Sequence, residues 1–137
     1  MPLTALHGFC DADWVGCKDD RHSTSGFAIY MGANLLSWGA KKQATISRST
    51  AEAEHRALAS TTTELIWFTN LLKSIGYCLP PLKLYCDNIS AITMARIQCF
   101  IIAQNILKSM FISLGNVLLV VPFCLNMLLA LLKLQTY

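Results

Sequence analysis

The sequence predicts one α/β fold with a mixed sheet: a three-stranded antiparallel meander, then a helix, a fourth strand and a second helix. Three observations favour this class. Short apolar runs typical of strands occupy residues 6–13, 26–31 and 35–40. A helical apolar seam begins after residue 50, and a fourth strand pattern at 82–87 comes directly before a helix-capping asparagine. With 137 residues the chain has room for one domain with a modest core.

The first three strands are predicted from alternation and turn chemistry. In residues 6–13 the side chains of Phe9, Asp11 and Asp13 fall on one face of a strand. The polar run 17–25 is typical of a turn. The runs 26–31 and 35–40 flank Gly32-Ala33-Asn34, which predicts a hairpin.

The first helix is predicted to begin near Thr50, because Ser49 and Glu52 have the spacing of a capping box. Glu54 begins a seam of side chains that would face the sheet, and Gly76 supplies a stop. The other positions of this seam are Leu58, Thr61, Leu65, Phe68 and Leu72.

The fourth strand follows a chain break at Pro80-Pro81 and ends at Asp87. Asn88 can then cap a second helix. The predicted buried positions of that helix are Ala91, Ile92 and Ala95.

Three carboxylates are predicted to point towards one end of the sheet: Asp11, Glu54 and Asp87. Clustered carboxylates repel each other, so such a group is stable mainly when divalent cations occupy it. Two Mg²⁺ ions held in this way can activate water and stabilise the leaving oxygen of a phosphodiester. Spacing alone is weak evidence for this site, because most acidic residues are solvated surface groups, and both interpretations are open at this point.

Composition limits the other classes of function. The net charge of +3 excludes a polybasic nucleic-acid arm, so any nucleic-acid site must be a local cluster. The six cysteines have no Cys-x-x-Cys pair and no histidine at zinc-finger spacing, which argues against a structural metal site and favours reduced thiols. No secretory signal opens the chain, so an intracellular location, cytoplasm or nucleus, is expected.

Residues 6–100 resemble the ribonuclease H domain of the Pol polyprotein of copia-type (Ty/copia) LTR retrotransposons. Several blocks carry the resemblance, in order and at matching spacing: GFCDADW at 8–14, RHSTSGF at 21–27, SWGAKKQ at 37–43, SRSTAEAEHRAL at 47–58 and LYCDN at 84–88. The resemblance implies a ribonuclease H-like fold and cleavage of the RNA strand of an RNA–DNA hybrid by two-metal hydrolysis. It also implies a reverse transcriptase domain that once belonged to the same polyprotein.

The resemblance implies that Asp11, Glu54 and Asp87 are three of the family's four metal-binding carboxylates. They would hold two Mg²⁺ ions, with Mn²⁺ as a substitute. Asp13 is the closest competitor for the first position. Asp13, Asp19 and Asp20 are interpreted as turn and surface groups.

Four basic residues are candidates for contacting the phosphates of the hybrid, with a solvated loop as the alternative interpretation. They are Arg21, Lys41, Lys42 and Arg48. Trp14 and Trp38 could stack on bases or sugars, but we expect them to pack in the core or at its rim.

The resemblance ends near Phe100, which divides the chain into a domain at 1–100 and an apolar tail at 101–137. The family continues with a histidine-rich loop and a final helix that carries the fourth aspartate. Here all eight acidic residues lie at or before Asp87. Synonymous codons for residues after Phe100, read in a shifted frame, can encode the missing segment, so we interpret the tail as the product of a frameshift that impairs the enzyme.

Two alternatives to an active nuclease remain at the level of sequence. One is an inactive nucleic-acid-binding remnant of a transposon. The other is a small single-span membrane protein, because residues 109–132 form an uncharged stretch long enough for one span. Gly115, Asn116, Pro122 and Asn126 interrupt that stretch, so an apolar helical extension is the preferred interpretation.

Overall fold

The fold follows the predicted order of strands and helices. A computed structural model describes residues 5–80 and 82–110. In chain order its elements are β1 (Leu6–Asp13), β2 (Thr24–Met31), β3 (Asn34–Lys42), α1 (Thr50–Ser74), β4 (Lys83–Tyr85) and α2 (Ile89–Met110). The sheet order is β3-β2-β1-β4, with β4 parallel to β1 and the other pairs antiparallel. The predicted mixed α/β class is therefore confirmed.

The β2–β3 hairpin closes more tightly than the sequence indicated. Met31 pairs with Asn34, so the loop contains two residues and Asn34 belongs to β3. Gly32 has a φ of 60°, the conformation that the first loop position of a type II′ turn requires. A register shift between Ile29 and Tyr30 then bends the two strands.

Helix α1 begins and ends where the capping signals predicted. The Ser49 side chain accepts a hydrogen bond from the backbone N–H of Glu52 at 3.2 Å. Glu52 accepts from the backbone N–H of Arg48 at 2.9 Å, one residue before its expected partner, and pairs with Arg56 one turn later. At the other end Gly76 has a φ of 85° and donates its N–H to the carbonyl of Lys73.

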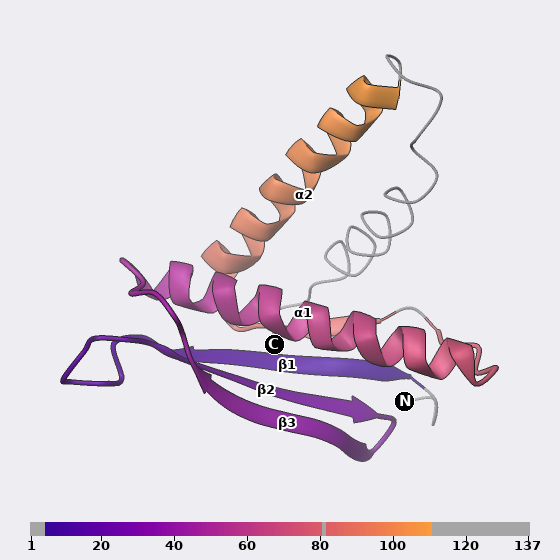
Figure 1. The fold of residues 1–137 in the computed structure, drawn as a ribbon, viewed down its shortest axis with the longest axis horizontal. Coiled ribbons are helices and arrows are strands. Elements are labelled where there is room, and N and C mark those ends of the chain that lie inside the picture. Colours follow the sequence, from indigo (N-terminus) through magenta and orange to yellow (C-terminus); the bar gives the residue numbers. More distant parts are fainter. Residues whose placement is uncertain (1–4, 81, 111–137) are drawn as a thin grey trace.

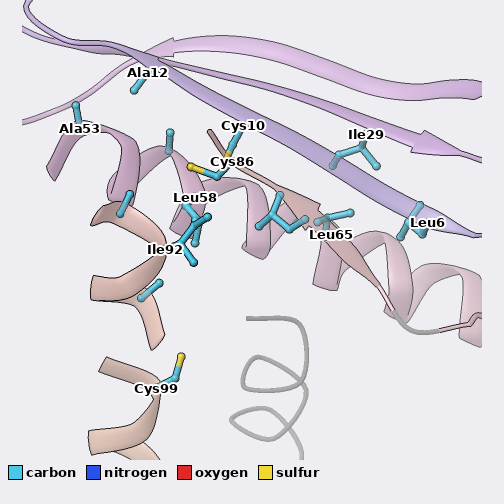
Figure 2. Packing of buried hydrophobic residues seen from close by; sticks show 14 residues of the cluster. Leu6, Cys10, Ala12, Ile29, Ala53, Leu58, Leu65, Cys86, Ile92 and Cys99 are labelled. Atoms are coloured by element: carbon cyan, nitrogen blue, oxygen red, sulfur yellow. The ribbon is translucent and has the colours of Figure 1, made fainter. Parts of the chain in front are cut away.

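The core lies between the sheet and α1, which covers one face of it (Figure 1). Alternate residues of β1 point into this core, while His7, Phe9 and Asp11 point the other way. Figure 2 shows the packed side chains, which include the predicted seam residues Leu58 and Leu65. The remaining buried apolar members are Leu6, Cys10, Ala12, Ile29, Ala53, Ala57, Leu84, Cys86, Ala91, Ile92, Ala95 and Cys99.

Asp87 lies between the short strand β4 and the long helix α2. Strand β4 contains three residues, fewer than predicted, because it lies at the sheet edge and pairs only with β1. Asn88 caps α2 as predicted, since its side-chain oxygen accepts from the N–H of Ala91 at 3.0 Å. Helix α2 begins beside the N-terminal part of α1 and points away from the sheet (Figure 1).

Helix α2 continues through Phe100 to Met110, so the proposed boundary at residue 100 falls inside a helix. Most of the predicted tail, including nearly all of the uncharged stretch 109–132, lies outside the described residues. Within residues 5–80 and 82–110, no helix combines the length and the apolar character needed to cross a membrane.

Candidate metal centre

The three predicted acidic residues come to one edge of the sheet. Asp11 lies near the carboxyl end of β1, and Asp87 lies two residues after β4. Because β1 and β4 are parallel, their carboxyl ends meet at the same edge. Glu54 lies near the start of α1, whose N-terminal part packs over this edge.

Asp11 and Glu54 meet at a single backbone group, the N–H of Ala12. This N–H donates to Oε1 of Glu54 at 3.1 Å and to Oδ1 of Asp11 at 2.8 Å. The bond to Glu54 joins α1 to β1 across 42 residues of sequence. It fixes the position of a side chain that the helix alone would leave free to rotate.

Glu54 is the buried member of the group. It is 4% exposed, and within the described residues its Oε2 atom has no hydrogen-bond partner. The pKa of Glu54 is raised to about 7, chiefly by burial and also by the nearby Cys86 and Asp11, while the hydrogen bond from the Ala12 N–H opposes the rise. A buried carboxylate with one oxygen unsatisfied is the arrangement that a bound cation stabilises.

Glu54, Cys86 and Asp87 form the tightest group of possible ligands among the described residues. One ligand atom from each lies within 4.8 Å of the other two. Asp87 is exposed, so the group opens to solvent on that side. Asp11 contacts this group through Glu54. The donors present, carboxylate oxygens with one buried and unpaired, fit a divalent cation.

Cys86 was missed by the sequence analysis, which argued against cysteine ligands from their spacing. It lies next to Asp87, just as Cys10 lies next to Asp11. The Cys10 thiol donates to the carbonyl of Tyr85 at 3.5 Å, and the interaction of the two neighbouring thiols raises the pKa of Cys10 and lowers that of Cys86 to about 7. Figure 2 shows them side by side at the sheet. The only sequence signal was this repeated Cys-Asp pair at the ends of two strands.

The competing acidic residues lie elsewhere. A Cβ added to Gly16 would collide with the Asp13 carboxylate, so that carboxylate lies over the β1–β2 loop. Asp20 pairs with Lys42 and accepts from the N–H of His22 at 3.1 Å, and the pairing with Lys42 holds its pKa well below the usual range. These positions agree with the interpretation of Asp13 and Asp20 as turn and surface groups.

The four predicted basic residues also lie at this end of the molecule. Lys41 and Lys42 end β3, and their neighbours across the sheet are Ser25 and Thr24, which in turn pair with Ala12 and Asp13. The two arginines, Arg21 and Arg48, lie in the β1–β2 loop and just before α1. All four are exposed.

The two tryptophans differ from each other. Trp14 is 43% exposed and donates its ring N–H to the carbonyl of Ser47 at 3.0 Å, which fits the predicted rim position. Trp38 is 73% exposed, so the expectation that it packs in the core or at its rim is wrong. It lies on edge strand β3, opposite Ala28 and on the sheet face that α1 does not cover, where no larger side chain buries it.

Comparison with known proteins gives several sequence relatives, retrotransposon Pol polyproteins among them, and a weak structural likeness. No family model matches the chain. The chain is 46% identical over 89 residues to the retrovirus-related Pol polyproteins of transposons RE1 and RE2 of Arabidopsis thaliana, which is 64% of this chain and 6% of each polyprotein. It is 35% identical over 91 residues to that of transposon TNT 1-94 of Nicotiana tabacum, 66% of this chain and 7% of the polyprotein.

The chain thus spans less than a tenth of the length of these polyproteins. Among solved structures, it is similar to RNase H1 from Halobacterium salinarum NRC-1, with a TM-score of 0.42 and 13% identity. That match covers 70% of this chain and 61% of the archaeal one.

Proposed function

The chain is homologous to a segment of the Pol polyproteins of copia-type retrotransposons, and from that premise we propose that it is their ribonuclease H domain. The proposed reaction is cleavage of the RNA strand of an RNA–DNA hybrid by phosphodiester hydrolysis. One observation carries the proposal: the buried, half-satisfied carboxylate of Glu54 lies between Asp11 and Asp87. Such a group costs stability unless a cation compensates it.

The metal-holding residues in this proposal are Asp11, Glu54 and Asp87, as the sequence predicted. Two Mg²⁺ ions, or Mn²⁺ in their place, would supply activation of a water and stabilisation of the leaving oxygen. The protein's own part is positional. The Ala12 N–H orients Asp11 and Glu54, and the Asn88 cap holds the start of α2 directly after Asp87.

The basic residues at the same end would bind the phosphates of the hybrid. Lys41, Arg21 and Arg48 are exposed and lie in separate segments around the carboxylates. Lys42 is committed to Asp20, so its contribution is smaller. The exposed Trp38 adds an aromatic surface on which a sugar or base can stack.

The enzyme is impaired in this proposal, since the fourth carboxylate of the family has no counterpart. The fifty residues after Asp87 contain no acidic side chain. A frameshift near Phe100 explains both that absence and the apolar tail. Reading the nucleotide sequence around Phe100 tests this: a stop codon in the shifted frame, or no histidines and aspartate there, would remove the explanation.

The activity is tested with the full chain, Mg²⁺ and a hybrid labelled on its RNA strand. We expect slow release of RNA fragments, and we expect Asp87→Asn to abolish it. The matched control is Asp19→Asn, which neutralises an exposed acid in the β1–β2 loop and should leave the rate unchanged. Equal cleavage by Asp87→Asn and the parent chain would refute the assignment.

The missing acid favours a second candidate, an inactive remnant that binds the hybrid without cutting it. Binding that depends on Lys41 but releases no RNA at any Mg²⁺ or Mn²⁺ concentration would identify that outcome. The rival of a single-span membrane protein depends on residues outside the described part of the chain. Recovery of the chain in a detergent-soluble membrane fraction would support it.

A further inference from the structure

We propose that Glu54, Cys86 and Asp87 form a binding site for a thiophilic divalent cation, with zinc as the natural candidate. Their three ligand atoms lie within 4.8 Å of one another. The set differs from the three carboxylates assigned to magnesium, because a sulfur atom takes part. It joins Glu54 of helix α1 to the adjacent residues Cys86 and Asp87 after strand β4, so two distant parts of the chain contribute.

The second observation that points to a ligand is the state of Glu54. Glu54 is only 4% exposed, and within the described residues its Oε2 atom accepts no hydrogen bond. An unsatisfied buried carboxylate oxygen costs free energy unless a cation binds it. A carboxylate oxygen of Glu54 lies in one ligand group with the exposed Asp87, so the group is open to solvent on the Asp87 side.

The donor types select the metal. Mg²⁺ binds oxygen ligands and leaves a thiolate unused, whereas Zn²⁺ binds thiolate sulfur at about 2.3 Å and carboxylate oxygen at about 2.0–2.2 Å. Three protein ligands with a fourth position open to water is an ordinary zinc arrangement. Ligand atoms at these distances around one tetrahedral ion lie about 3.3–3.8 Å apart, so ligands that now lie within 4.8 Å of one another must close by on the order of an ångström.

Neighbouring groups flank the sulfur of Cys86. The Cys10 thiol lies beside Cys86 and donates to the carbonyl of Tyr85 at 3.5 Å, and Asn88 follows Cys86 two residues later. Both neighbours belong to rigid elements, since Cys10 lies in β1 and Asn88 caps α2. Outer partners of this kind orient metal ligands and tune their affinity. Cys10 is therefore a positioning residue and not a ligand.

Zinc at this site shares Glu54 and Asp87 with the proposed magnesium centre, so the two ions exclude each other. Zinc would then inhibit hybrid cleavage, and that consequence alone rests on the proposed function. Zinc binding itself is independent of it. A chain that binds zinc through Cys86 but never cuts a hybrid would support this proposal and refute the other.

The test uses the full chain kept reduced with a phosphine, so that no competing thiol is present and Cys10 and Cys86 cannot form a disulfide. Cobalt(II) serves as the spectroscopic probe, because a thiolate ligand gives it an intense near-ultraviolet charge-transfer band. Zinc affinity is measured by competition against a chromophoric chelator. We compare the parent chain with Cys86→Ser, and we use Cys78→Ser as the control because Cys78 is an exposed thiol outside the ligand group.

We expect the cobalt band in the parent chain and in Cys78→Ser, and its loss in Cys86→Ser. Zinc affinity should fall in Cys86→Ser by more than about 100-fold, beyond the effect of losing an outer-sphere partner. If Cys86→Ser does not fold, as judged by circular dichroism, X-ray absorption of the zinc-loaded parent chain decides instead: one sulfur neighbour at about 2.3 Å is expected. No band in the folded parent chain, a band that survives in folded Cys86→Ser, or a zinc shell without sulfur would overturn the proposal.

Discussion

Asp11 and Glu54 share one hydrogen-bond donor, the backbone N–H of Ala12. This N–H brings a strand carboxylate and a helix carboxylate together, although like charges repel. The arrangement is compensated only in part, since Oε2 of Glu54 has no partner in the part of the chain that the structure describes. The chemistry of this edge therefore depends on what neutralises Glu54.

Stability without metal should fall as the pH rises. The pKa of Glu54 is raised from 4.5 to about 7 in the folded chain, so between these values the folded state holds more protons than the unfolded state. The free energy of unfolding should decrease across this window by on the order of 3 kcal/mol. Urea denaturation in a chelator at pH 4.5, 6 and 8 measures it.

Glu54→Gln is the matched variant for this titration, because it keeps the shape and removes the charge. It should flatten the pH dependence, and Mg²⁺ at pH 8 should stabilise the parent chain but not the variant. An equally steep decrease in Glu54→Gln would show that another group titrates.

The first metal position should belong to Asp11 and not to Asp13. Asp11 contacts the Ala12 N–H beside Glu54, whereas the Asp13 carboxylate lies over the loop at Gly16. Asp11→Asn should lower the rate of hybrid cleavage by about 100-fold or more, as expected when a metal that supplies several kcal/mol is lost. Asp13→Asn should change it by less than about 3-fold, equivalent to less than 1 kcal/mol. The reverse order would exchange the two roles.

Lys41 should contribute one phosphate contact to hybrid binding. It is exposed at the end of β3, and unlike Lys42 it has no ion pair among the described residues. Lys41→Ala should weaken binding of every hybrid sequence and reduce the slope of log K against log salt by about 1. Fluorescence anisotropy across a salt series measures this slope.

Lys73→Ala removes the same charge from the last turn of α1 and serves as the control. It should leave the slope unchanged. Equal effects of the two variants would mean that binding follows net charge and not a local site.

Loss of the α1 cap should destabilise the whole domain. Ser49 accepts from the N–H of Glu52, and replacing a serine cap by alanine costs about 1 kcal/mol. Ser49→Ala should therefore lower the free energy of unfolding in urea by about that amount. Ser60→Ala, at an exposed position inside the same helix, should leave stability unchanged or raise it by a few tenths of a kcal/mol.

Local signals in the sequence were enough to predict most of the fold. The alternation in residues 6–13 predicted both ends of β1, and the caps Ser49, Gly76 and Asn88 predicted where the helices begin and end. These features act within a few residues, so their effect can be read from the chain itself. The length of β4 could not be predicted, because β4 leaves the sheet after its pairing with Phe9 although β1 continues to Asp13, and that departure depends on how the later chain packs.

The exposure of Trp38 could not be predicted from the sequence either. A tryptophan on a strand usually packs against something, but here it lies on the outermost strand and on the face that no described helix covers. Whether a strand lies at an edge is a property of the whole sheet.

The sequence by itself predicted that three acidic residues, Asp11 on a strand, Glu54 near the start of a helix and Asp87 after a strand, lie at one end of the sheet. Only the tertiary structure decided that the three residues differ in burial. It buries Glu54 and leaves Asp11 and Asp87 exposed. It also placed the sulfur of Cys86 among them. Parallel pairing of β1 with β4 aligns the Cys10-Asp11 pair with the Cys86-Asp87 pair, and such pairing between distant segments depends on long-range packing that no local pattern encodes.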